Sequence, residues 1–185
     1  MIISLAGLPG AGKSTVKKLL AEKLGLKSYG MGDLRGKMAL ERGMTIDEFN
    51  ALGMTESFTD KDVDGFQEQL GKTEDNFIAD GWVSWHFIPH SFKVFLSIDP
   101  RIGAERIFNA RKNEKDRDDE PLYRSVEETQ QILKDRVAQN QARYEKWYQI
   151  DFLNLANYDL VIDTTSLTPE EVVEQILKAR PAISA

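Results

Sequence analysis

The stretch Gly7-Leu8-Pro9-Gly10-Ala11-Gly12-Lys13-Ser14 decides the fold of this chain. It matches the pattern G-x-x-x-x-G-K-[ST], with an apolar run at 2–6 before it and an apolar stripe at helical spacing over 13–24 after it. Glycines let successive backbone N–H groups point at phosphate oxygens, and the start of the helix adds the positive end of its dipole. The stretch therefore predicts a strand, a phosphate-binding loop and a helix.

The residues of this loop have separate expected roles. We expect Lys13 to reach the β- and γ-phosphates of ATP as a catalytic cation. We expect Ser14 to place its hydroxyl on Mg²⁺, which prefers oxygen ligands. The spacing is not the G-x-G-x-x-G of dinucleotide-binding proteins, and the sequence holds no N-K-x-D guanine reader. The expected contacts of ATP are Gly7, Leu8, Pro9, Gly10, Ala11, Gly12, Lys13, Ser14 and Thr15.

Composition narrows the class of protein. A chain of 185 residues is the size of one domain with one core. The net charge of −6 argues against a nucleic acid or an anionic membrane as partner, and the opening apolar run is too short for a membrane span. There is no cysteine, which excludes disulfides and thiolate catalysis and is compatible with a reducing compartment. We expect a cytoplasmic enzyme with a small-molecule partner.

Strand-like and helix-like segments alternate along the rest of the chain. Thr45 and Glu48 form a capping-box pattern before a short helix to Leu52, and Thr168 is expected to cap the terminal helix. Parallel sheets with helices on both faces arise from such alternation. We therefore predict an α/β fold of three layers, the P-loop NTPase fold, with a five-stranded parallel sheet flanked by helices. The expected strands are 2–6, 26–30, 76–81, 92–99 and 158–163, and the other expected helices are 33–42, 60–70, 100–109 and 126–148.

Three side chains outside the loop are candidates from their position alone. Asp80 ends an apolar strand and suits an outer-sphere role on Mg²⁺, with helix capping as the alternative. Arg35 follows the second strand, where an arginine can clamp a phosphate with two hydrogen bonds, and a solvated helix residue is its alternative. For Asp33, position alone indicates the N-cap of its helix. Residues 110–121 are almost all charged, so we expect a mobile segment there.

Several strings of the sequence, taken together, are typical of one family. They are the phosphate loop, Gly32-Asp33-Leu34-Arg35, residues 41–49, Asp80-Gly81, residues 101–107, Arg143-Tyr144 and residues 158–163. With these strings the sequence resembles the nucleoside monophosphate kinases, in particular the archaeal-type cytidylate kinases. The resemblance spans the whole chain. It implies that Arg35 holds the acceptor monophosphate, and that Asp33 and Asp80 orient waters on Mg²⁺.

The resemblance also implies how one kinase domain over 1–185 is divided. The core would comprise 1–30, 73–109 and 150–185. An acceptor-binding helical insert would lie at about 31–72, with an amphipathic helical hairpin as the alternative reading, and a lid at about 110–136.

Arginines are expected to close over the transferred phosphate, because charge spreads over its oxygens in the transition state. Arg136 and Arg143 are seven residues apart, which places them on one face of a helix with Asn140 between them. From the resemblance we expect these two arginines to be catalytic clamps, and Arg106 and Arg111 to lie near the donor. Simple solvation of a helix surface is the alternative for each arginine.

One position departs from the resembling kinases. They carry an arginine directly after the glycine that aligns with Gly81, whereas this chain has Trp82. Trp82 is then a candidate stacking surface for a base, or a packing residue. The function expected from the sequence is ATP-dependent phosphorylation of CMP or dCMP with Mg²⁺, by a monomer or weak homodimer. The alternatives are a P-loop kinase with a different acceptor and a nucleotide-binding module with weak turnover.

Overall fold

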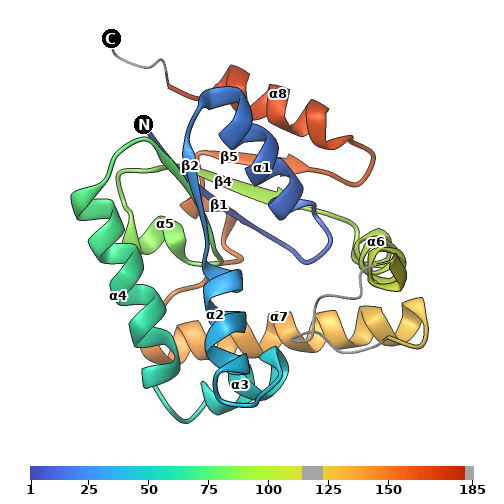
Figure 1. The fold of residues 1–185 in the computed structure, drawn as a ribbon. Coiled ribbons are helices and arrows are strands. Elements are labelled where there is room, and N and C mark those ends of the chain that lie inside the picture. Colours follow the sequence, from blue (N-terminus) through green and yellow to red (C-terminus); the bar gives the residue numbers. More distant parts are fainter. Residues whose placement is uncertain (114–122, 182–185) are drawn as a thin grey trace.

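The computed structural model describes residues 1–113 and 123–181. Its centre is one sheet of parallel strands in the order β2-β3-β1-β4-β5 (Figure 1). This confirms the predicted five-stranded parallel sheet. The strands are β1 (Ile2–Gly7), β2 (Lys27–Gly30), β3 (Phe77–Asp80), β4 (Phe92–Ser97) and β5 (Leu160–Asp163).

Helices cover the sheet and extend beyond the carboxyl ends of its strands. Figure 1 shows α1 and α8 side by side on the sheet, with α2, α3 and α7 grouped beyond the strand ends. The described helices are α1 (Lys13–Leu24), α2 (Met31–Leu40), α3 (Ile46–Leu52), α4 (Phe58–Thr73), α5 (Ser84–Phe87), α6 (Pro100–Asn113), α7 (Val126–Tyr148) and α8 (Pro169–Ala179), with a short 3₁₀ helix at Leu155–Asn157.

The register of the sheet places the ends of three strands together. Asp80 of β3 lies opposite Gly30 of β2 on one side and opposite Leu5 of β1 on the other. The phosphate-binding stretch, the residue before α2 and the acidic end of β3 therefore meet at one edge. In open parallel sheets this edge is where ligands bind.

Apolar residues fill both faces of the sheet. One buried cluster joins β1, β4 and β5 to α1 and α8, through residues such as Leu5, Leu20 and Ile176. A smaller cluster on the other face joins Phe77 of β3 to Leu70 of α4. The sheet is therefore the middle of three layers, as the alternating pattern predicts. Within the described residues, no helix has both the length and the apolar character needed to cross a bilayer.

The helix ends follow their capping residues. The Thr45 side chain accepts a hydrogen bond from the Glu48 backbone while the Glu48 carboxylate accepts one from the Thr45 backbone, so the predicted capping box is confirmed. Thr168 caps α8 in the same way. Helix α7 has the predicted bounds.

The ends of α2, α4, β4 and β5 differ from the predicted ends by two or three residues. Three further expectations differ from the structure. Helix α6 continues to Asn113, beyond the predicted end at 109, because arginine and lysine are good helix formers even where a segment buries little. The one-turn helix α5 was not predicted, since its few residues carry too short a pattern. The N-cap alternative for Asp33 is wrong, because α2 begins earlier, at Met31, with Gly30 as its N-cap.

Candidate active site

The phosphate loop joins β1 to α1 with a backbone that requires glycine. Gly10 and Gly12 have φ values of 82° and 84°, in the left-handed region that favours glycine. A Cβ atom at Gly10 would lie 2.4 Å from the carbonyl oxygen of Gly103 in α6. The backbone of α6 therefore packs so closely against the loop that Gly10 has no space for a side chain. Lys13 begins the helix that follows the loop.

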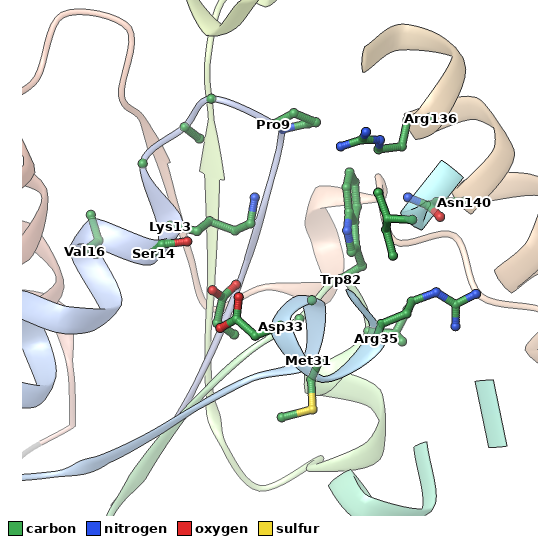
Figure 2. Close-up of a pocket in the computed structure, with 18 of the residues that line it drawn as sticks. Pro9, Lys13, Ser14, Val16, Met31, Asp33, Arg35, Trp82, Arg136 and Asn140 are labelled. Carbon is green, nitrogen blue, oxygen red and sulfur yellow. The ribbon is translucent and has the colours of Figure 1, made fainter. Parts of the chain in front are cut away.

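Lys13 points into the cleft beside the loop (Figure 2). Its Nζ donates hydrogen bonds to the carbonyl oxygens of Gly7, at 2.8 Å, and Leu8, at 3.1 Å. Burial lowers the pKa of Lys13, and the charge of Asp80 opposes that shift. Gly7 and Leu8 thus hold the lysine through their backbone and are not among the described residues that line the cleft.

Two carboxylates and one lysine stand next to the loop. Asp80 is nearly buried, and burial raises its pKa while Lys13 and Lys17 oppose the rise. Lys17 Nζ lies 3.6 Å from Asp80 and 3.4 Å from the exposed Asp33. Figure 2 shows Ser14 and Asp33 on the same side of the cleft. Hydroxyl and carboxylate oxygens suit Mg²⁺, although the described residues hold no group of three acidic or histidine side chains that would bind it alone.

Opposite the loop, two buried arginines share one carboxylate. Asp60 Oδ1 accepts a hydrogen bond from Arg35 Nη1 at 2.7 Å, and Asp60 Oδ2 lies 3.2 Å from Arg143 Nε. The amide oxygen of Asn50 accepts from both arginines, at 2.8 and 3.2 Å. The Nη2 atom of Arg35 is buried and has no hydrogen-bond partner among the described residues. We call Arg35, Arg143, Asp60 and Asn50 the arginine cluster. Its positive charge exceeds its negative charge, so it is suited to binding an anion.

The remaining predicted arginines take different positions. Arg136 donates two hydrogen bonds to the Asp47 carboxylate, at 2.9 and 3.1 Å, which links α7 to α3. Arg106 donates to the carbonyl oxygens of Thr164 and Thr165. Both arginines line the cleft, whereas Arg111, five residues further along α6, is not among the described residues that do. Residues 114–122 of the expected lid lie outside the described residues.

Trp82 both packs and lines the cleft. Its ring makes an edge-to-face contact with Phe152, with centroids 4.7 Å apart, and Lys13 Nζ lies 5.6 Å from its centroid. Figure 2 shows the ring standing between Lys13 and Asn140. At Gly81 a Cβ atom would lie 2.4 Å from Ser84 Oγ and 2.9 Å from Met31 Cγ, so the chain turns there without space for a side chain.

The cleft has a volume of about 630 Å³ and joins the loop to the arginine cluster. Sequence reasoning did not find Asn50, Asp60, Asp64 and Gln67 among its lining residues. A sequence pattern could have indicated three of these four. Asp60, Asp64 and Gln67 follow an i, i+4, i+7 spacing, which puts polar residues on one helix face. The predicted residues that line the cleft are Pro9, Gly10, Ala11, Gly12, Lys13, Ser14, Thr15, Asp33, Arg35, Asp80, Gly81, Trp82, Arg106, Arg136 and Arg143.

A parallel sheet with this strand, loop and helix at its central strand defines a P-loop nucleotide-binding protein. A family model described as "AAA domain" matches residues 3–134. The chain is 37% identical over 179 residues to a cytidylate kinase of Methanocella arvoryzae, covering 97% of this chain and 96% of the relative. It is 35% identical over 180 residues to a cytidylate kinase of Archaeoglobus fulgidus, covering 97% and 94%. The chain belongs to the cytidylate kinase family.

Solved structures support the fold. A protein of Eubacterium ventriosum described as uncharacterized matches with a TM-score of 0.70 at 14% identity, covering 96% of each chain. A shikimate kinase of Aquifex aeolicus matches with a TM-score of 0.57 at 22% identity, covering 97% of this chain and 95% of that one. These likenesses concern the arrangement of helices and strands.

Proposed function

We propose that this protein transfers the γ-phosphate of ATP to CMP or dCMP, with Mg²⁺ as cofactor. The observation that carries the proposal is the cleft itself, which has a phosphate loop on one wall and two buried arginines, Arg35 and Arg143, on the other. Such an arrangement suits a reaction between two phosphate-bearing substrates. Membership of the cytidylate kinase family supports CMP as the acceptor.

The donor half of the site is the phosphate loop. The backbone of residues 7–15 would cradle the ATP phosphates, with Lys13 at the β- and γ-phosphates. Ser14 would be a direct ligand of Mg²⁺, and Asp33 and Asp80 would orient its waters, since this ion usually keeps several of them. The ion would supply charge stabilisation on the transferring phosphoryl group. Arg106 and Arg111 complete the proposed donor side.

The acceptor half is the arginine cluster. Arg35 would bind the acceptor monophosphate through Nη2, for which residues 1–113 and 123–181 supply no hydrogen-bond partner. Gly81 and Trp82 would lie beside the acceptor. Arg136 and Arg143 would stabilise the charge that spreads over the transferred group, as the residues that α7 brings to the cleft.

The proposed division of the chain follows these halves. The core comprises 1–30, 73–109 and 150–185, the acceptor-binding insert about 31–72, and the lid about 110–136. Closing of the lid would exclude water during transfer. We further propose a cytoplasmic monomer or weak homodimer that binds neither nucleic acid nor membranes.

Trp82 favours a second candidate, a P-loop kinase with a different acceptor. The resembling cytidylate kinases have an arginine at this position, and here an aromatic ring faces the cleft beside Lys13. With tryptophan in place of arginine, one expected contact to an anion is lost, and the indole offers a surface on which another ring could stack.

A coupled assay with ATP, Mg²⁺ and each common nucleoside monophosphate decides between the two candidates. We expect CMP and dCMP to give the highest kcat/KM. A panel of phosphorylatable metabolites, including shikimate, is tested in parallel by thermal shift, because the true acceptor stabilises the protein beyond ATP alone. Turnover restricted to AMP, UMP or a metabolite would contradict the first candidate.

A further inference from the structure

A polar face of α4 reaches the cleft beyond the arginine cluster. Asp60, Asp64 and Gln67 are all buried and all line the cleft, although they are polar. Asp60 is committed to Arg35 and Arg143. Asp64 and Gln67 lie one and two turns further along the helix, at about 6 and 10 Å from Asp60 along its axis. They are therefore displaced along the helix from Asp60 and from the phosphate end of the proposed acceptor site.

Hydrogen bonds hold the Asp64 and Gln67 side chains in place. Ser84 Oγ donates to the Gln67 amide oxygen at 2.6 Å, and the Gln67 amide nitrogen donates to Asp64 Oδ1 at 3.2 Å. The Tyr148 hydroxyl donates to Asp64 Oδ2. Each carboxylate oxygen accepts one of these bonds and has capacity for a second, and the glutamine amide has two N–H donors. The pair can therefore accept from a ligand and donate to it.

Apolar residues also line the cleft near this pair. Met31 and Val63 belong to one apolar cluster and both line the cleft. Gly81 brings the backbone against Met31 and Ser84, where a Cβ atom would clash. Apolar walls with a few fixed polar groups at one end are typical of a site for a small aromatic ligand.

We propose that Asp64 and Gln67 read the hydrogen-bonding edge of the acceptor base and select cytosine over uracil; this inference rests on the proposed function. The Asp64 carboxylate accepts from the exocyclic amino group, and the Gln67 amide donates to the ring nitrogen beside it. Cytosine carries an amino donor where uracil carries a carbonyl acceptor, which a carboxylate repels. Arg35, whose buried Nη2 has no hydrogen-bond partner in the described part of the chain, marks the phosphate end of the same acceptor. Tyr148 and Ser84 are positioning residues.

Electrostatics agree with this geometry. Burial raises the pKa of Asp64 to about 7, with the Tyr148 hydrogen bond opposing the rise, Asp60 adding to it, and Arg35 and Arg143 opposing it. The carboxyl group is thus costly to ionise in the empty cleft, and a donor from the ligand would stabilise the ionised form. Assays at pH 8 keep the group ionised and acceptor-only.

The test compares kcat/KM for CMP and UMP at pH 8 in wild type, Asp64→Asn and Gln67→Leu. Asp62→Asn is the matched control, because Asp62 is exposed on the same helix and loses the same charge. We expect wild type to prefer CMP, and the ratio of CMP to UMP to fall roughly tenfold or more in Asp64→Asn, with a fall in the same direction in Gln67→Leu. The control keeps the ratio, and KM for ATP stays unchanged in all variants.

Circular dichroism establishes that each variant is folded, and Gln67→Leu carries the test if Asp64→Asn is not. Unchanged ratios in folded variants of a CMP-phosphorylating wild type would overturn this inference and leave the proposed function standing. A wild type that neither binds CMP in preference to UMP by calorimetry nor phosphorylates it would overturn both.

Discussion

The proposed donor and acceptor halves of the cleft are built in different ways. The donor half is made of consecutive residues, and its geometry comes from backbone at Gly10 and Gly12 and from the start of α1. The acceptor half is made of buried side chains from α2, α3, α4 and α7, centred on Asp60. A site made of consecutive residues can be recognised from a short sequence pattern, whereas the geometry of a site assembled from four helices depends on how those helices pack. The predictions below probe this difference, from the largest expected effect to the smallest.

The largest effect is expected in the donor half. Lys13→Ala removes the cation at the transferred phosphate, and we expect kcat to fall by roughly 10²- to 10³-fold, with little change in KM for the acceptor. Steady-state kinetics measure both parameters. Lys18→Ala is the control, because Lys18 is an exposed lysine of the same helix. If Lys13→Ala keeps its kcat within about threefold, the proposed role of the loop lysine is wrong.

A mutation in the acceptor half should change a different kinetic parameter. We expect Arg35→Met to raise KM for the acceptor by about 10- to 100-fold while KM for ATP stays nearly constant, because charge-assisted bonds to a phosphate are strong. We also expect about 2 kcal/mol of lost stability, since Asp60 keeps only Arg143 as a cationic partner. Urea unfolding measures the loss. Lys37→Met, at an exposed position of α2, is the control. If Arg35→Met raised KM for ATP as much as KM for the acceptor, the two substrates would not bind in separate halves of the cleft.

Asp64, in the acceptor half, should also make the free energy of unfolding depend on pH. The pKa of Asp64 is raised from 3.8 to about 7 by burial, so the folded state holds this proton more tightly than the unfolded state does. Its stabilising contribution is complete below pH 3.8 and is lost as pH rises through about 7. Asparagine does not ionise, so the Asp64→Asn variant does not lose this contribution as pH rises. Its free energy of unfolding minus that of wild type should therefore increase by up to about 2 kcal/mol between pH 5 and pH 8.

Urea unfolding at the two pH values measures that difference, with Asp62→Asn as the exposed control on the same helix. A stability difference between Asp64→Asn and wild type that is the same at both pH values would show that the carboxyl group titrates normally.

The smallest effect is expected where the two halves meet. Trp82→Arg restores the residue of the resembling kinases, and we expect KM for CMP to fall by roughly three- to tenfold if the acceptor is a nucleoside monophosphate. The nearby Lys13 limits the gain through like-charge repulsion. Trp82→Phe controls for loss of the indole while keeping an aromatic ring. A rise in KM for CMP with Trp82→Arg would instead favour stacking on the indole as the native role.

The fold could be read from local patterns to a large extent. Helix α7 and the capping boxes at Thr45 and Thr168 lie where the sequence places them, because caps and helical periodicity are local signals. Helix α5 cannot be predicted locally because its four residues carry too little pattern, and α6 continues to Asn113 although the charged composition of that segment predicts a mobile loop.

The site divides in the same way. The sequence by itself determined the phosphate loop, since eight consecutive residues specify both its backbone and its lysine. It also marked Arg35, Arg136 and Arg143 as candidates, without their partners. Only the tertiary structure decided that Arg35 and Arg143 share Asp60, that Arg136 pairs with Asp47, and that Trp82 faces the cleft. These contacts join residues far apart in the chain, and packing between helices, which no local pattern encodes, brings them together.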